Sequence, residues 1–371
     1  MKIEVYSPPI RRKEMDAVLT AMVEEKIGPG DRNKLLIQTA KEQLKFDYAL
    51  ALRSPAVALH FALKALNARL LEARNAEDTP QRSEGAVIIS ALSPRYYLQV
   101  LEDLQLMPIF CDVTYDFPCM SREKIENAIA QKPDGFEIRA IVLHHTLGFL
   151  PDSVSITELG IPVIEDISQS YGSWKKPEGK DGEENPSAYV SPVFNGVFCI
   201  LGLEERDMLT SGGGALLFAM NRKDGLVLRN FASLAEEYCL PDINAALAVV
   251  QFKEVQRNIE KRKDIASIYT KASLSLATRT KHKRFISRLD DENKYCFSLV
   301  LETGLKDVIA YAKKKDIILE NAFDKTVAGE ASRENCPVSN SLVLRTVLFP
   351  LYPRLRSQEV DKISRLIMTL P

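Results

Sequence analysis

The chain has 371 residues, of which 46% are hydrophobic and 27% are charged, and its formal net charge is -1. This length and apolar content can fill more than one compact core, so we expect two domains. Both signs of charge are mixed along the chain, which provides no field to attract nucleic acid or an anionic membrane. We therefore expect a small-molecule partner.

The six cysteines are widely spaced and form no CxxC pair, which argues against a zinc site or a disulfide framework. Arg11, Arg12 and Lys13 lie near the N-terminus, but the segment that follows is amphipathic. A secretion signal or a membrane span needs a continuous apolar run there. We therefore expect a cytoplasmic protein with reduced thiols, no membrane partner and no metal site.

In chain order, the first half alternates between helical and extended patterns. Residues 34–46 have helical periodicity, and the apolar strand 48–52 leads into a helix that begins at Pro55 and runs to 73. The alternation continues through strand 86–92, helix 95–106, strand 107–113, helix 121–131, strand 138–145 and strand 161–167. This order predicts an α/β fold with a mostly parallel sheet covered by helices on both faces.

The pattern changes after three consecutive glycines at 212–214. A strand over 214–220 is followed by a long helical pattern over 243–274, and the helical segments 305–315 and 357–370 close the chain. We therefore predict a large α/β domain over 1–250 and a smaller α+β domain over 251–371. Two polar segments rich in proline, glycine and charge, 73–86 and 173–189, are predicted to be exposed loops.

Four segments together resemble the DegT/StrS-type nucleotide-sugar aminotransferases, which are fold type I enzymes dependent on pyridoxal phosphate (PLP). They are "GPGDRNKLLIQTAKEQLKFDYALALRSPAVALHFALKAL", "VIISALSPRYYLQVLEDLQLMPIFCDV", "GIPVIEDISQSYGS" and "CPVSNSLVLRTVLFPLYPRLRSQEVDKISRLI". The resemblance covers nearly the whole chain and implies the fold type I transferase architecture. It also implies a homodimer, because this family builds its pocket from two subunits. The apolar segment 243–252 agrees with a dimer, since it carries more apolar surface than a small domain needs to cover.

The resemblance implies a set of groups around PLP: a lysine that forms a Schiff base, a carboxylate for the pyridine nitrogen, phosphate donors and a stacked aromatic ring. Asp166 stands at the position of the carboxylate, and Gln169 at that of a glutamine near the ring. His145 matches a strand-end histidine of the family. Because His144 and His145 alternate across their strand, at most one of them enters the pocket.

The Schiff-base lysine is missing from its position. Counting back from the glycines by the family's interval reaches Arg206, and a two-residue change of the gap reaches Glu204. A guanidinium stays protonated in proteins, so Arg206 cannot form a Schiff base or act as a neutral amine base.

The remaining cofactor contacts are altered as well. Ser54, Pro55 and Ala56 stand where the family has Ser-Gly-Thr, which removes one backbone N–H and one hydroxyl from the phosphate cup. The other positions that the resemblance assigns to the pocket are Leu201 for a serine donor, Pro94 for the stacking aromatic, and Glu237 for an asparagine that the partner subunit contributes. Tyr96 and Tyr97 lie close enough to Pro94 to leave the stacking group open.

Three functions remain open at this point. The first, which we favour, is a non-catalytic or non-canonical relative without bound cofactor that binds a nucleotide sugar or another anionic metabolite, or pairs with an active relative. The others are an active aminotransferase with a lysine from elsewhere, and a lysine-independent dehydratase that uses pyridoxamine phosphate (PMP). In the first case Asp166 could simply cap the next turn. We expect Arg206 to pair with Asp166 or with a neighbouring glutamate, not with an external anion.

Overall fold

The computed structural model of the chain describes residues 2–75, 84–173, 194–286, 293–302, 304–331 and 334–371. The two predicted loops, 73–86 and 173–189, lie largely outside these residues.

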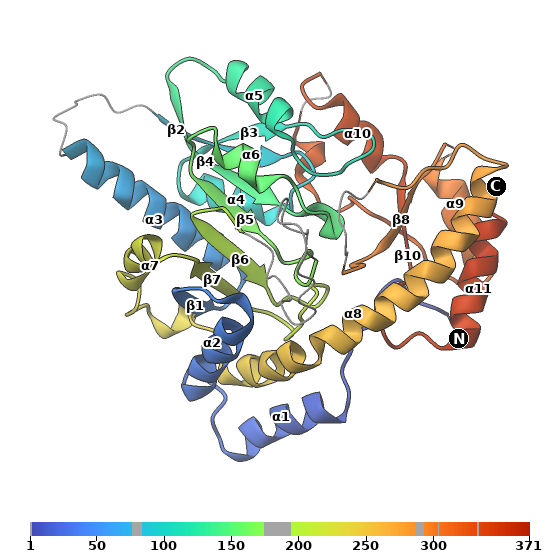
Figure 1. Cartoon of the computed structure of the whole chain (residues 1–371), viewed down its shortest axis with the longest axis horizontal. Coiled ribbons are helices and arrows are strands. Elements are labelled where there is room, and N and C mark those ends of the chain that lie inside the picture. Colours follow the sequence, from blue (N-terminus) through green and yellow to red (C-terminus); the bar gives the residue numbers. More distant parts are fainter. Residues whose placement is uncertain (1, 76–83, 174–193, 287–292, 303, 332–333) are drawn as a thin grey trace, which may run out of the picture.

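A seven-stranded sheet forms the centre of the molecule (Figure 1), with the strand order β1-β7-β6-β5-β4-β2-β3. The strands are β1 (Tyr48–Leu52), β2 (Glu84–Ser90), β3 (Met107–Cys111), β4 (Phe136–His144), β5 (Val163–Asp166), β6 (Phe198–Gly202) and β7 (Ala215–Ala219). The five strands β3, β2, β4, β5 and β6 pair in parallel in this order, and β7 is antiparallel to both β1 and β6. The predicted α/β class with a mostly parallel sheet is confirmed.

Each face of the sheet has its own apolar core. Successive side chains of a strand point to opposite faces. Val142, Ile164 and Ile200 pack in one core with residues of α3 (Pro55–Asn75) and α4 (Tyr96–Asp103). Leu201 packs in the opposite core with residues of α2 (Asp31–Leu44). The helices α5 (Arg122–Ala130), α6 (Ser153–Thr157) and α7 (Arg222–Arg229) complete the cover of the sheet.

A second, three-stranded antiparallel sheet has the order β8-β10-β9. Its strands are β8 (Phe297–Val300), β9 (Glu320–Asn321) and β10 (Thr346–Phe349), and the accompanying helices are α9 (Leu305–Lys313), α10 (Pro337–Val343) and α11 (Ser357–Met368). The turns η1 (Thr146–Gly148), η2 (Glu236–Tyr238) and η3 (Val327–Gly329) are single 3₁₀ turns. This sheet has its own core with residues of α9 and α11.

The helix α8 (Asp242–Ala277) connects the two sheets as one continuous element (Figure 1). Its first half, including Phe252, packs in a core of the large sheet, and its second half, including Tyr269, packs in the core of the small sheet. The boundary that we predicted at residue 250 therefore falls inside a helix. The division into two domains stays a prediction.

Several elements were not assigned from the sequence. Among them is β6, a buried central strand whose continuous apolar run carries no alternation. The helices α1 (Arg12–Val23), α7 and α10 were also not predicted. Among the described residues, no helix combines the length and apolar content that crossing a membrane requires.

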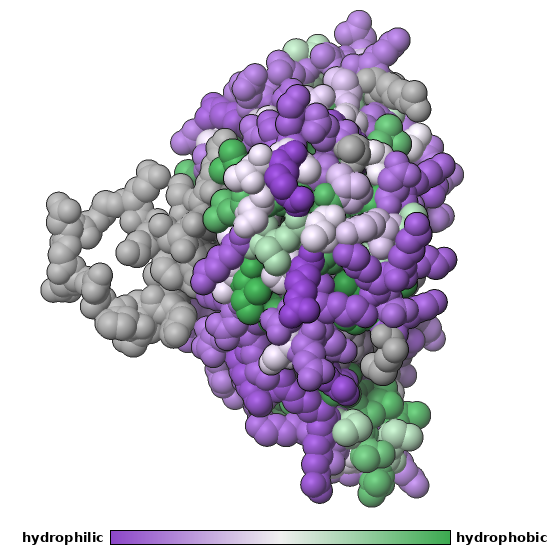
Figure 2. All heavy atoms as spheres, turned by 90° about the vertical axis from the view of Figure 1, so that its right-hand side faces the viewer, coloured by the Kyte–Doolittle hydropathy of each residue, from purple (hydrophilic) through white to green (hydrophobic). Residues whose placement is uncertain are grey.

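We expected segment 243–252 to supply the surplus apolar surface of a dimer, but a group of exposed apolar side chains lies on α1 instead. No side chain of 243–252 is exposed, because this part of α8 is packed within the chain. Met15, Leu19, Met22 and Val23 are instead between 51% and 83% exposed. Figure 2 shows a hydrophobic patch at the lower end of the molecule, where Figure 1 places α1.

Asp242 joins the first turn of α8 to the start of α2. Its side chain is 1% exposed and accepts hydrogen bonds from the backbone N–H groups of Gly30 (3.0 Å), Arg32 (3.0 Å) and Asn33 (3.1 Å). These N–H groups have no partner within their own helix, and a carboxylate also interacts favourably with the positive end of the helix dipole. One buried carboxylate thus holds two helices of the large core together.

We expect Asp242→Asn to lower the free energy of unfolding by about 1.5–3 kcal/mol, because the amide group replaces one charged acceptor with a donor that faces N–H groups. Urea denaturation measures this loss. Asp264→Asn, at an exposed position of the same helix, is the matched control and should change stability by less than about 0.5 kcal/mol. Equal effects of the two substitutions would show that the Asp242 contacts contribute nothing specific.

Candidate functional site

Asp166 lies at the carboxyl end of β5, in the middle of the parallel part of the large sheet. Ligands of open α/β sheets bind at this edge, outside the carboxyl ends of the strands. Asp166 is buried, with 1% of its surface exposed. A buried carboxylate is stable only if surrounding groups donate hydrogen bonds to it, so its donors determine what this site can do.

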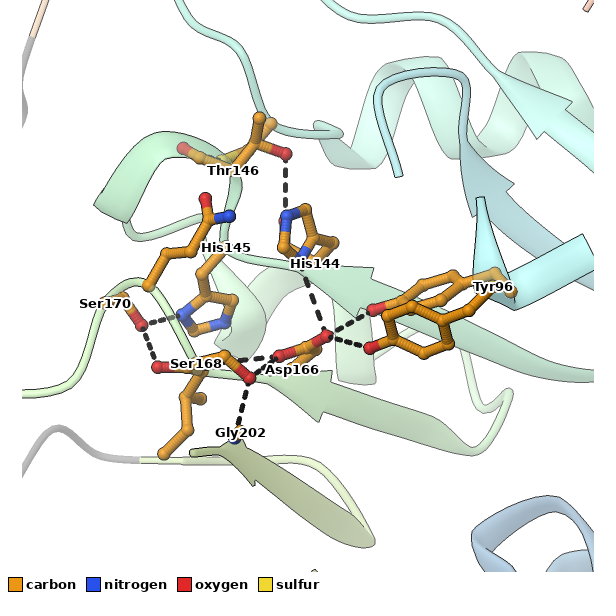
Figure 3. A network of polar contacts seen from close by, with 12 residues as sticks. Tyr96, His144, His145, Thr146, Asp166, Ser168, Ser170 and Gly202 are labelled. Atoms are coloured by element: carbon orange, nitrogen blue, oxygen red, sulfur yellow. Dashed lines mark hydrogen bonds and ion pairs between the residues drawn. The ribbon is translucent and has the colours of Figure 1, made fainter. Parts of the chain in front are cut away.

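Both oxygens of Asp166 accept hydrogen bonds from the protein (Figure 3). The hydroxyl groups of Tyr97 and Tyr96 donate to Oδ2 over 2.7 and 3.1 Å, respectively. Ser168 donates to Oδ1 from its hydroxyl over 2.5 Å and from its backbone N–H over 3.1 Å. The bond from the Ser168 N–H confirms that Asp166 caps the turn after β5. The two tyrosines were seen in the sequence, but their role as donors was not predicted.

Electrostatics keep Asp166 ionised. Burial opposes the charged form, but the contact with His144 and the hydrogen bonds from Ser168 and Tyr97 overcome this effect and hold the pKa of Asp166 well below its usual range. The same burial, together with the Asp166 charge, raises the pKa of both Tyr96 and Tyr97 well above the ordinary value. The site therefore consists of one carboxylate and two protonated phenols.

The turn after β2 brings the tyrosines to Asp166. Pro94 forms an isolated antiparallel bridge with Thr326, and the backbone N–H of Arg95 donates to the carbonyl of Lys325 over 3.2 Å. These contacts attach the turn to the chain that precedes η3. The Tyr96 and Tyr97 rings then pack edge to face, with centroids 4.9 Å apart. Pro94 belongs to this backbone junction and presents no aromatic face.

His144, and not His145, is the histidine beside Asp166. His144 Nδ1 lies 3.5 Å from Asp166 Oδ2. His145 follows on the opposite face, where its Nε2 lies 3.2 Å from Glu165 Oε2 and its Nδ1 contacts the Ser170 hydroxyl at 2.7 Å. Alternation along the strand allowed only one of the two at the site, and residue parity selects His144.

Gln169 is held within the protein. Its side-chain oxygen accepts from the backbone N–H of Leu147 over 2.7 Å, and its carbonyl accepts from the Asn293 amide over 2.7 Å. Asn293 is itself buried and also donates to the carbonyl of Tyr171 over 2.9 Å. The segment after Asp166 is therefore fixed by the chain that leads into β8.

The positions expected to form a phosphate cup do not form one group beside Asp166. The Ser54 hydroxyl accepts from the Val57 N–H over 3.3 Å, and so caps the start of α3. Pro55 has no N–H, and Ala56 has no side-chain donor. Leu201 is fully buried in the core on the opposite face of the sheet from Asp166. The donors missing from the expected cup are therefore the backbone N–H at position 55 and hydroxyl groups at positions 56 and 201.

Arg206 points away from Asp166. Its guanidinium forms two hydrogen bonds with Glu320 of β9, over 2.5 and 3.2 Å. It also lies over the Tyr6 ring, 6.0 Å from the centroid. The expected pairing with Asp166 does not occur, and the glutamate that pairs with Arg206 lies in β9, where the pair is partly exposed and does not fill the site. The next residue, Asp207, packs against Gly202 beside the Ser168 hydroxyl, and it was not selected from the sequence.

Glu237 is exposed in η2. Its predicted approach to the pocket of a second subunit stays a prediction. Among the described residues, no group of three or more histidine, cysteine, aspartate or glutamate side chains could hold a metal ion.

A family model described as the DegT/DnrJ/EryC1/StrS aminotransferase family matches residues 8–183 and 217–368. The chain belongs to this family. A curated relative, the dTDP-4-amino-4,6-dideoxy-D-glucose transaminase of Escherichia coli, is 23% identical over 288 residues, which are 71% of this chain and 73% of the relative. The residues between the two matched ranges include β6 and Arg206.

Solved structures of similar fold cover almost the entire chain. The GDP-4-keto-6-deoxy-D-mannose-3-dehydratase of Escherichia coli, with bound hydrated PLP, has a TM-score of 0.79 at 12% identity and covers 99% of both chains. The aminotransferase TlmJ of Streptoalloteichus hindustanus has a TM-score of 0.77 at 15% identity, and covers 99% of this chain and 98% of its own. The predicted fold type I transferase architecture is confirmed.

The residues of this family member do not fit PLP. A pyridine nitrogen needs an acceptor on Asp166, but protein donors already occupy both of its oxygens. Arg206, which the resemblance assigns to the lysine position, is turned to Glu320. At the start of α3, Ser54 bonds to its own helix. We therefore derive no reaction step through the cofactor.

We expect Tyr97→Phe to lower the free energy of unfolding by about 1.5–3 kcal/mol, since it removes a buried hydrogen bond to a charged group. Tyr96→Phe should cost less, because Tyr96 is only partly buried and its bond is longer, 3.1 against 2.7 Å. Denaturation in urea measures both. Tyr115→Phe, at a 52% exposed side chain, is the control. A neutral Tyr97→Phe would contradict the assigned role of this hydroxyl.

Proposed function

We propose that this chain is a member of the DegT/DnrJ/EryC1/StrS family that has lost Schiff-base catalysis and acts in the cytoplasm as a ligand-binding or partner subunit. The observation that carries the proposal is the state of Asp166. In this chain Tyr96, Tyr97 and Ser168 satisfy both oxygens of the carboxylate. The carboxylate then stabilises the fold and has no acceptor left for a cofactor ring.

Two further observations support the proposal. The Arg206 side chain is engaged with Glu320 at the surface, where both side chains are partly exposed, at 45% and 35%. The helix start at Ser54 has fewer donors for a phosphate, because Pro55 has no N–H, Ala56 has no hydroxyl and the Val57 N–H bonds to the Ser54 side chain. The changes at Asp166, at Arg206 and at the start of α3 each remove a contact that the cofactor would need.

The relatives suggest which ligand class to test. The curated relative is named for a dTDP-linked amino sugar, and a dehydratase of similar fold is named for a GDP-linked sugar. We therefore propose a nucleotide sugar as the small-molecule ligand. Binding without chemistry would suit a protein that senses such a metabolite or that supports an active relative.

We expect the protein to purify without colour and Arg206→Lys to form no covalent bond with added PLP. The side chain at position 206 points to Glu320, so a lysine there would lie away from Asp166. The other cofactor contacts would still be absent. Visible absorbance and intact mass after borohydride reduction measure the bond. The Escherichia coli transaminase relative is the positive control for the procedure. A reduced adduct on the wild-type chain would refute the proposal and favour an active aminotransferase.

The same samples distinguish the remaining functions. A rise in melting temperature with dTDP-glucose, but not with PLP or PMP, would support the ligand-binding function. A rise with PMP would favour the lysine-independent dehydratase instead, and would contradict the loss of cofactor binding.

We also propose a homodimer, and expect the exposed stripe of α1 at the contact. Met15, Leu19, Met22 and Val23 form one exposed apolar face, and a face of this kind on a soluble protein usually marks an interaction site. Sedimentation velocity at micromolar concentration should show a dimer. Leu19→Glu should shift the wild-type dimer toward monomer, whereas Leu274→Glu, at an exposed position of α8, should not. A monomeric wild type would refute the dimer.

A further inference from the structure

A cavity of about 170 Å³ lies between the turn after β4, the second half of α8 and the chain around the start of β8. Its lining comes from residues 147–149 of the turn, Ala266 and Thr270 of α8, and residues 284–285 and 293–298. Asp166 and its hydrogen-bond donors are not among the described residues that line this cavity. The fold therefore offers a second place at which a small molecule can bind.

Close packing and hydrogen bonds fix the walls of the cavity. A Cβ atom built on Gly148 would lie 2.7 Å from the Cβ atom of Tyr295 and 3.1 Å from Asn293 Oδ1, so the turn packs directly on the chain before β8. Asn293 is buried, and its side-chain oxygen accepts from the Tyr295 N–H over 2.8 Å. Beside Arg284, Lys283 and Val300 exchange two backbone hydrogen bonds, over 2.9 and 2.8 Å.

Positive charge marks the polar side of the cavity. The Arg284 guanidinium donates to the Thr270 hydroxyl over 2.9 Å and forms no ion pair within the described part of the chain. A guanidinium has five N–H donors, so most of them remain available to a ligand. No described carboxylate lines the cavity, and residues 265–286 contain five lysines and arginines but no aspartate or glutamate. The cavity therefore favours an anion.

The rest of the cavity is apolar and small. The side chains that supply aliphatic and aromatic surface are Leu147, Phe149, Ala266, Phe285 and Phe297. The Phe149 and Phe285 rings pack edge to face, with centroids 5.8 Å apart. In another protein, a cavity of about 150 Å³ holds one benzene ring. A volume of about 170 Å³ therefore admits one six-membered ring and excludes the two fused rings of a purine.

We propose that this cavity binds the nucleotide part of a pyrimidine nucleotide sugar. The pyrimidine ring lies between the apolar walls, and the diphosphate lies at the solvent side, where the exposed Arg284 forms forked, charge-assisted hydrogen bonds with it. Contact of a base with aromatic side chains, together with a cation at the phosphates, is the chemistry that holds nucleotides. The inference rests on the proposed function, because it assigns a place to the ligand class proposed there.

The cavity adjoins the Asp166 site through Gln169. The Gln169 side chain accepts from the Leu147 N–H over 2.7 Å, and its carbonyl accepts from the Asn293 amide over 2.7 Å. Both donors line the cavity, whereas Ser168, which precedes Gln169, donates to Asp166. The nucleotide thus binds beside the Asp166 site and leaves the hydrogen bonds of Asp166 intact.

Isothermal titration calorimetry with dTDP, dTDP-glucose and GDP tests the site. The wild type should bind dTDP and dTDP-glucose with similar affinity and GDP about tenfold more weakly, because a fused ring system overfills the cavity. Arg284→Gln should raise the dissociation constant for dTDP by about tenfold, since it removes a charged hydrogen-bond donor. Arg279→Gln is the matched control, at an exposed arginine that donates to the Met368 carbonyl, and should bind as the wild type does.

A second pair of variants separates the space in the cavity from its charge. Ser298 lines the cavity and is partly exposed. Ser298→Leu fills part of the space and should raise the dissociation constant for dTDP by about tenfold, although Arg284 is unchanged. Ser298→Ala adds no volume and should retain the wild-type affinity. Unfolding curves in urea verify that the variants remain folded.

Three results would overturn the inference. If dTDP-glucose binds the wild type but neither Arg284→Gln nor Ser298→Leu weakens it, the proposed ligand stands and its site is elsewhere. If GDP binds as tightly as dTDP, the assignment of a pyrimidine to the cavity is wrong. If no nucleotide binds the wild type, the inference fails together with the proposed ligand.

Discussion

The buried charge of Asp166 is the constraint on which the candidate site depends. A carboxylate at the end of a central parallel strand cannot stay ionised at 1% exposure unless donors surround it. Here the donors come from α4, through Tyr96 and Tyr97, and from the next turn, through Ser168. Removing one of these groups weakens the support of a charge in the core, by an amount that depends on the burial and length of the lost bond. The acid therefore imposes strict requirements on its neighbours even where no cofactor uses it.

The fold could be predicted from the sequence because it depends on which faces of each element are buried. Strand β1 was predicted with its observed bounds, and the helices α3 and α8 to within a few residues. β6 was not predicted, since a strand buried on both faces has no period-2 pattern. The boundary predicted at 250 lies within α8, which contributes to two cores in succession, a feature that periodicity alone cannot reveal.

The site could be predicted only in part, because side-chain direction changes with every residue. Asp166 was located correctly at the strand end, but the neighbouring histidine was taken as His145 and proved to be His144. A shift of one residue transfers a side chain to the other face of the sheet. The same rule places Leu201 in the opposite core. The tyrosine donors were missed because hydrogen bonding between Tyr97 and Asp166 joins residues that are far apart in sequence.

The loop with Arg206 and Asp207 shows why counting from a motif is not sufficient. Gly212, Gly213 and Gly214 have φ values of 73°, 142° and 118°, which residues with a Cβ rarely adopt. The Leu203 carbonyl accepts from the N–H groups of Ser211 and Gly213, over 2.9 and 3.1 Å. These backbone contacts define the path of the loop independently of the side chains at 206 and 207. The glycines thus preserve a path in which Arg206 faces β9 and Asp207 packs against Gly202 beside Ser168, so the side chain that approaches the site is set by the backbone and not by the count from the motif.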